Sequence, residues 1–151
     1  MTRLPYVDHD APTPLQKIVS ETPEILSAYL QMEKALGNVL KPNILELTRL
    51  RVAANNDCKF CKSIELNKLD ANKRNVALRK EQSIDLTLKE EAALQLVDEV
   101  MAYHGILTDQ LFSKVKEHFS AKEIIALLFQ IGQKNSGGWF NIAMDVAEQN
   151  N

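Results

Sequence analysis

The chain contains few of the residues that interrupt helices. Its last proline is Pro42, and only 5 glycines are spread over 151 residues. Proline is the strongest helix breaker, so residues 43–151 can be almost entirely helical. No segment alternates apolar and polar residues as a half-buried strand does. These absences predict an all-α fold.

The low net charge, the few aromatic residues and the short apolar runs exclude several classes of partner. The net charge is −2 and aromatic residues make up 6%, so neither a positive field nor a stacking platform for nucleic acid is expected. The longest apolar run, 124–129, is far shorter than the roughly 20 residues of a membrane helix. Asp8, His9 and Asp10 interrupt any secretory apolar core, which favours a cytoplasmic protein.

Apolar periodicity and capping residues place the helices. We expect a compact bundle of about six to eight helices over residues 21–151, a single domain, preceded by an extended N-terminal arm over 1–20. A helix break is expected at 136–138, where serine precedes two glycines. The almost continuous apolar sequence from residue 124 predicts a central, buried helix. The expected helices are 22–37, 43–55, 58–69, 70–80, 87–105, 109–118, 120–134 and 139–146.

Only 2 cysteines are present, and they form a C-x-x-C pair, Cys58 and Cys61. Asp57 is a favoured N-cap residue, so both sulfurs are expected in the first turn of a helix, where backbone amides favour an anion. Basic residues outnumber acidic ones between residues 58 and 80, which also favours thiolate. In a reducing compartment such a pair indicates redox or metal chemistry rather than a structural disulfide.

A metal site is the weaker of these two readings. A structural zinc site needs a second C-x-x-C or a pair of histidines, whereas His9, His104 and His118 are scattered along the sequence. No serine elbow and no glycine-rich phosphate loop occurs. We therefore expect neither a metal nor a cofactor.

One run of residues resembles a known family. The run Glu46 to Cys61, ELTRLRVAANNDCKFC, is similar to the motif of the alkylhydroperoxidase D-like (AhpD-like), or carboxymuconolactone decarboxylase, family of small all-helical proteins. Further similarity lies in residues 107–112, 118–124 and 135–143. The resemblance covers most of residues 20–150.

The resemblance implies roles for particular residues. In members with peroxidase activity the second cysteine attacks peroxide and the first resolves the product as a disulfide. A glutamate twelve residues before the first cysteine belongs to a proton relay. These positions are Cys61, Cys58 and Glu46. The relay normally includes a histidine four residues after the second cysteine, where this chain has Glu65.

Glu65 is the candidate to replace that histidine. On one continuous helix, Glu65 shares a face with Cys61 and Cys58, and a protonated carboxyl can donate and recover a proton. Two carboxyls that lie close together can also share one proton. Both glutamates have ordinary alternatives: Glu46 can pair with Arg49, and Glu65 can pair with nearby lysines.

The leading functional prediction is a thiol-dependent peroxidase or disulfide reductase. Its partners would be a peroxide substrate and a dithiol reductant protein, lipoyl- or thioredoxin-like. The resemblance also implies a homo-oligomer, a trimer or a hexamer. The missing histidine keeps open a redox sensor or oligomeric scaffold, and a lactone decarboxylase is a third possibility, although those members do not depend on a C-x-x-C pair.

Overall fold

Helix α3 (Pro42–Asn55) lies at the centre of the fold in the computed structural model, which describes residues 1–82 and 85–149. The other helices are α1 (Pro14–Val19), α2 (Pro23–Gly37), α4 (Lys59–Ser63), α5 (Ala71–Ala77), α6 (Leu88–Ala102), α7 (Asp109–His118) and α8 (Ala121–Ala143). Within the described ranges there are eight helices and no strand, so the predicted all-α fold is confirmed. Residues 83–84 and 150–151 of the predicted 21–151 domain lie outside the described residues.

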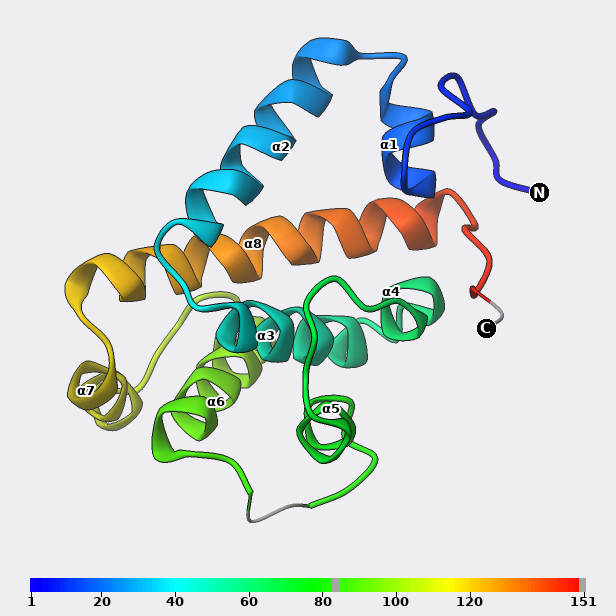
Figure 1. Cartoon of the computed structure of the whole chain (residues 1–151). Coiled ribbons are helices and arrows are strands. Elements are labelled where there is room, and N and C mark those ends of the chain that lie inside the picture. The colour runs from blue at the N-terminus through cyan, green and yellow to red at the C-terminus, as the bar shows by residue number, and fades with distance from the viewer. Residues whose placement is uncertain (83–84, 150–151) are drawn as a thin grey trace.

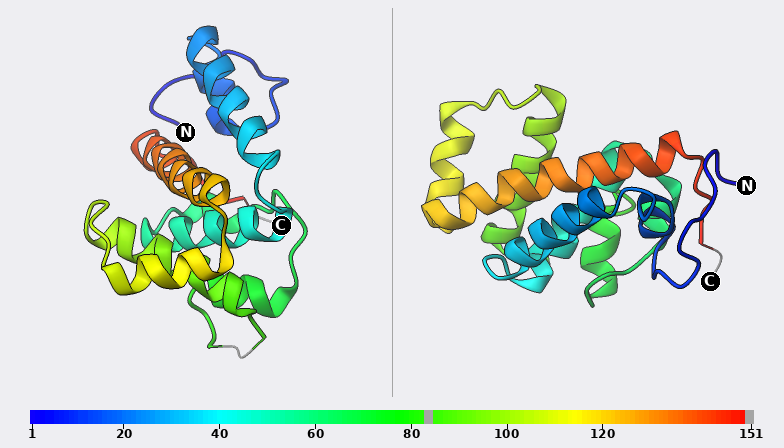
Figure 2. Two further views of the ribbon diagram at one scale, coloured as in Figure 1. Left: turned by 90° about the vertical axis from the view of Figure 1, so that its left-hand side faces the viewer. Right: turned by 90° about the horizontal axis from the view of Figure 1, so that it is seen from above.

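The helices form two groups on opposite sides of α8. Helices α1 and α2 pack against one side, and α3 packs against the other, with α5 and α6 beyond it (Figures 1 and 2). The main apolar core lies between α3, α6, α7 and α8, and a smaller cluster joins α3 to α5 and α6. Because α3 is covered on several sides, it buries polar residues as well as apolar ones, including Glu46, Arg49 and Arg51.

Two predicted capping boxes are confirmed. The Thr87 and Ser120 side chains accept from the backbone amides of Glu90 and Glu123, and each glutamate accepts from the backbone amide of its cap residue. This reciprocal pairing satisfies amides that have no partner at a helix start. The capping residues therefore fix where α6 and α8 begin.

The predicted helix break at residues 136–138 is wrong, because α8 continues through both glycines to Ala143. Close packing explains the glycines. A Cβ atom at Gly137 would stand 2.6 Å from the Tyr29 hydroxyl oxygen, and one at Gly138 would stand 3.1 Å from Nδ2 of Asn56. The glycines let α8 approach α2 and the end of α3 instead of forming a turn.

The apolar sequence that begins α8 is only partly buried. Its Ile124 and Leu127 side chains enter the core, whereas Ile125, Leu128 and Phe129 remain exposed. The predicted central place of this helix agrees with its packing between the two groups, but the predicted burial is wrong for its exposed face. Periodicity alone did not identify which side of α8 is left uncovered.

The N-terminal residues are less extended than predicted, since α1 lies within them. Thr13 caps α1 by accepting from the Gln16 amide, and Pro14 occupies its first turn. Leu15 and Ile18 are buried. The division into an arm and a domain stays a prediction. Across the described residues no helix combines the length and hydropathy needed to span a bilayer.

Candidate functional site

The cysteine pair follows a sharp turn at the end of α3. Asp57 has a positive φ of 51°, a conformation that aspartate tolerates better than most residues, and its carboxylate pairs with Lys62. Cys58 itself, not Asp57, is the N-cap of α4, so the predicted cap is wrong. Helix α4 is also short and ends at Ser63 instead of continuing to residue 69.

The two sulfurs form a disulfide and have different surroundings. The Cys58 side chain is 1% exposed, and its Sγ accepts from the backbone amide of Cys61 at 3.2 Å. Cys61 is partly exposed and lines a cavity. Only Cys61 of the pair therefore faces space in which a small molecule can approach, and the backbone amide contact expected for the attacking sulfur is made by Cys58 instead.

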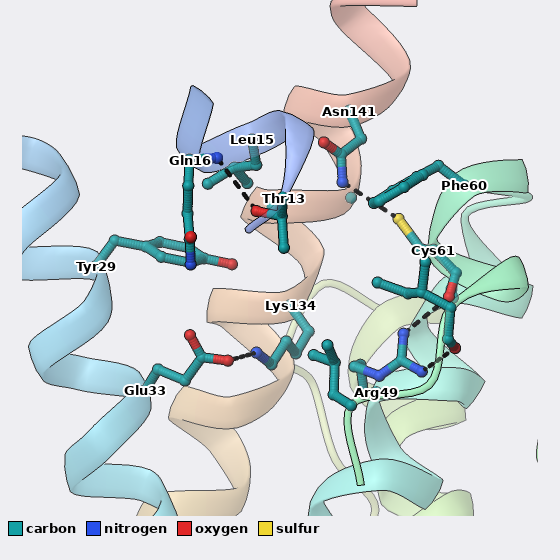
Figure 3. Close-up of a pocket in the computed structure, with 15 residues that line it drawn as sticks. Thr13, Leu15, Gln16, Tyr29, Glu33, Arg49, Phe60, Cys61, Lys134 and Asn141 are labelled. Carbon is teal, nitrogen blue, oxygen red and sulfur yellow. Dashed lines mark hydrogen bonds and ion pairs between the residues drawn. The ribbon is translucent and has the colours of Figure 1, made fainter. Parts of the chain in front are cut away.

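The cavity beside Cys61 has a volume of about 120 Å³ and lies between α1, α2 and α8 on one side and α3 and α4 on the other (Figure 3). Apolar side chains form much of its wall, among them Leu15, Phe60, Ile64 and Leu66. The polar residues that line it are Thr13, Gln16, Tyr29, Glu33, Arg49, Lys134 and Asn141.

Two proton-bearing groups lie on the side of the cavity formed by α2 and α8. Lys134 pairs with Glu33 at 2.9 Å. Burial raises the pKa of Tyr29 to about 12, and the negative charge of Glu33 adds to the effect. The Tyr29 hydroxyl is therefore protonated at neutral pH and available as a hydrogen-bond donor.

Glu46 and Arg49 hold in place the segment that carries the cysteines, residues 58–67, which we call the redox loop. The fully buried Glu46 carboxylate accepts from Arg49 through Nε at 3.0 Å and Nη2 at 2.5 Å, and from the backbone amides of Leu66 and Asn67. Arg49 in turn donates to the carbonyl oxygens of Cys61 and Ile64, both at 2.8 Å. This network satisfies carbonyls that the short helix α4 leaves free.

The structure does not bring Glu65 together with the cysteines on one helix. Glu65 follows the end of α4, is exposed, and makes no hydrogen bond or ion pair with the other described residues. The expected shared face depended on a helix that ends two residues earlier, so that part of the prediction is wrong. Glu46 contacts the redox loop and forms an ion pair with Arg49, as its alternative interpretation predicted.

The basic residues near the cysteines are mostly used elsewhere. Lys73 pairs with Glu90, Arg79 pairs with Asp98, and Arg74 donates to the carbonyl oxygens of Lys62 and Ile64. These contacts hold α5 and the 64–70 segment to the bundle. In the part of the chain that the structure describes, no cluster of three or more histidine, cysteine, aspartate or glutamate side chains is placed to hold a metal ion.

Among the cavity residues that were not assigned a chemical role from the sequence are Tyr29, Arg49, Lys134 and Asn141. Tyr29 belongs to an apolar helical stripe, and Arg49 appeared only as an ion-pair partner. Asn141 lies in the last stretch of family similarity, 135–143, which was the available signal for α8. Its Nδ2 atom lies 3.6 Å from Sγ of Cys61.

Comparison with known proteins places the chain among uncharacterised relatives. The uncharacterized protein YdfG of Bacillus subtilis (strain 168) is 30% identical over 131 residues, which is 81% of this chain and 88% of YdfG. The uncharacterized protein Rv2313c of Mycobacterium tuberculosis (strain H37Rv) is 33% identical over 97 residues, or 61% of this chain. That match spans 34% of Rv2313c. No protein-family model matches the chain.

Two solved structures share the fold at low identity. ATU0492 from Agrobacterium tumefaciens, a protein of unknown function described as a candidate AhpD antioxidant defence protein, has a TM-score of 0.74 at 22% identity, covering 88% of this chain and 96% of its own. The debrominase Bmp8, solved as a cysteine-to-alanine variant with 2,3,4-tribromopyrrole, has a TM-score of 0.75 at 17% identity, covering 89% and 76%. The predicted AhpD-like fold is confirmed, and the chain belongs to the family of the Bacillus subtilis protein YdfG.

Proposed function

We propose that the protein is a thiol-dependent peroxidase or disulfide reductase in which Cys61 attacks a peroxide and Cys58 resolves the product. One observation carries the proposal: the two cysteines are paired as a disulfide, and only Cys61 lines the cavity. An attacking thiol must meet its substrate, whereas a resolving thiol needs only to reach the first sulfur.

The reaction balances in three steps. The Cys61 thiolate attacks the terminal peroxide oxygen, so an S–O bond forms, the O–O bond breaks, and the leaving alkoxide takes one proton. The Cys58 thiol then displaces water from the Cys61 sulfenic acid and the disulfide forms. A dithiol protein of the lipoyl or thioredoxin type reduces the disulfide and is itself oxidised to a disulfide.

The mechanism that we propose also needs a group that gives a proton to the leaving alkoxide. Glu46 and Glu65 were predicted to shuttle it, but Glu46 accepts four hydrogen bonds and Glu65 is exposed beyond α4. Tyr29 and Lys134 line the same cavity as Cys61 and are competing donors. Glu65→Gln tests the exposed carboxyl as the donor, and Tyr29→Phe tests the cavity hydroxyl. Only the variant that removes the proton donor is expected to slow peroxide consumption.

Peroxide consumption with a dithiol present tests the proposal directly. We expect Cys61→Ser to abolish turnover. Without the dithiol, Cys58→Ser should consume one equivalent of peroxide and leave a sulfenic acid that dimedone traps. Lys122→Ala is the matched control, since Lys122 is exposed and lies outside the basic segment 58–80. Turnover that survives Cys61→Ser would refute the proposal. A wild type whose thiols oxidise without turnover would instead support the redox sensor or scaffold.

A second candidate reaction is reductive dehalogenation of a small halogenated ring. The opening of a partly apolar cavity onto Cys61 favours it, and the debrominase Bmp8 shares the fold. Two thiols and a bromoarene would give the arene, bromide, a proton and a disulfide, so no further reductant is required. Bromide release from a brominated pyrrole under single-turnover conditions tests this reaction. Lactone decarboxylation, the third prediction, has no comparable support from the site.

Assembly into a homo-oligomer is part of the same proposal. Helices α2 and α8 present exposed apolar side chains along a shared groove, including Ile25, Met32, Leu128 and Phe129. Groups of exposed apolar residues commonly mark contact surfaces between proteins. Light scattering should give the mass of a trimer or hexamer for the wild type and a smaller mass for Phe129→Glu. Ile106→Glu, at an exposed residue outside the groove, should leave the mass unchanged.

A further inference from the structure

The Asn141 carboxamide lies directly over the redox sulfur, although the sequence assigned it no role. Asn141 is 7% exposed, and its Nδ2 atom lies 3.6 Å from Sγ of Cys61 (Figure 3). Its Oδ1 atom is buried and has no hydrogen-bond partner in the described part of the chain. A buried carbonyl oxygen without a partner is costly, and such atoms often belong to functional sites.

The packing of α8 makes this contact possible. Gly138, one turn before Asn141, lies so close to the redox loop that a Cβ atom there would be 4.0 Å from Sγ of Cys61. Asn56, at the end of α3, donates to Oδ1 of Asn135 at 2.7 Å and joins the two helices beside the loop. A Cβ atom at position 138 would be in ordinary contact with this sulfur but only 3.1 Å from Nδ2 of Asn56, so the glycine leaves room for the Asn56 side chain beside the loop.

We infer that Asn141 is a catalytic residue that holds the Cys61 sulfur through both halves of the proposed reaction. In the reduced protein Nδ2 donates to the thiolate and stabilises it. Oδ1 accepts from the O–H of the incoming hydroperoxide, and after transfer of that oxygen it accepts from the O–H of the sulfenic acid. The inference rests on the proposed role of Cys61 as the attacking thiol.

The chemistry of the two amide atoms fits the two states of the sulfur. A thiolate accepts hydrogen bonds, whereas a hydroperoxide and a sulfenic acid each carry an O–H that must donate. A carboxamide supplies a donor and an acceptor from one side chain without adding a charge that would repel the thiolate. Cys58 already has the backbone amide of Cys61 as a donor, so Asn141 supplies the corresponding donor for Cys61.

The test uses the full-length protein in a Cys58→Ser background, where Cys61 is the one remaining thiol. The pH dependence of alkylation by iodoacetamide reports the thiolate, and trapping by dimedone after one equivalent of cumene hydroperoxide reports the lifetime of the sulfenic acid. Asn141→Ala removes both amide atoms. Asn141→Asp keeps an oxygen acceptor but replaces the donor with a negative charge.

We expect Asn141→Ala to raise the pKa of the Cys61 thiol and slow alkylation at neutral pH by roughly tenfold or more, the effect of one hydrogen bond to a charged group. The same variant should shorten the sulfenic acid lifetime. Asn141→Asp should slow alkylation further but preserve the lifetime, because its oxygen still accepts. An effect of Asn141→Asp on alkylation without an effect on the sulfenic acid lifetime is not expected of a residue that only supports the fold.

The control is Gln130→Ala, on the same helix. Gln130 is also buried and donates through its carboxamide to the carbonyl oxygen of Leu45 at 3.1 Å, away from the cavity. Its loss should leave the alkylation profile unchanged. Should Asn141→Ala fail to fold by circular dichroism, Asn141→Ser takes its place.

Three results would overturn the inference: unchanged alkylation in a folded Asn141→Ala, an equal effect from Gln130→Ala, or a sulfenic acid lifetime that Asn141→Ala leaves unaltered. Failure of the proposed function looks different. If the wild type consumes no peroxide while alkylation still depends on Asn141, the peroxidase proposal fails and the donor role of Asn141 is retained.

Discussion

Replacing Glu46 with glutamine tests whether the buried ion pair supports the redox loop. Glu46 is fully buried, and its partner Arg49 is 5% exposed. Glutamine keeps one oxygen acceptor but leaves the guanidinium charge without its counter-charge. Breaking a buried pair from one side costs about 3–5 kcal/mol. For a domain of this size the melting temperature should fall by roughly 6 to 20 °C, at about 2–4 °C per kcal/mol.

Urea unfolding of the wild type and Glu46→Gln, with and without a reductant, measures the loss. Glu123→Gln is the matched control, because its pair with Lys89 is partly exposed and its loss should cost no more than about 1 kcal/mol. If Glu46→Gln costs no more than this control, the reasoning is wrong. Should the variant not fold, the double change Glu46→Gln with Arg49→Met should recover part of the stability, because the charge of Arg49 is removed while that of Arg74, 3.8 Å from Glu46, remains.

Three further predictions concern pH and packing. Burial raises the pKa of Glu90, but hydrogen bonds from Thr87, Lys73 and Asn43 outweigh this effect and hold the pKa below its usual value of 4.5. The stability that the ionised Glu90 contributes should therefore be lost as the pH falls below 4.5. Acid unfolding of Glu90→Gln should therefore show a shallower pH dependence than that of the wild type, with Glu117→Gln as control. One of the 3 tyrosines should ionise near pH 12, and Tyr29→Phe should remove that step from the absorbance at 295 nm. In thermal melts, Gly132→Ala should stabilise the protein by about 0.5–1 kcal/mol, because a Cβ atom there meets nothing within 4 Å, whereas Gly137→Ala should destabilise it. Equal effects of the two variants would contradict the packing argument.

Local signals in the sequence determined most of the helices. Thr87 with Glu90 and Ser120 with Glu123 specify the starts of α6 and α8, because a capping box is a contact between residues three apart and needs no tertiary partner. The absence of proline after Pro42 excluded interruptions in the rest of the chain. The cysteine pair was singled out by its local spacing, whereas Glu46 was predicted from the resemblance to the AhpD-like motif.

Tertiary structure decided the features that depend on contacts between distant segments. The two adjacent glycines of α8 have the composition of a turn, but close contacts with Tyr29 and Asn56 make them part of a continuous helix. Helix α4 ends at Ser63, and Arg49 donates to the carbonyl oxygen of Ile64 directly after it. Glu65 therefore lies outside the helix that its spacing predicted. Asn141 is 80 residues from Cys61 in the sequence, so only the packing of α8 against α4 brings its amide to the sulfur.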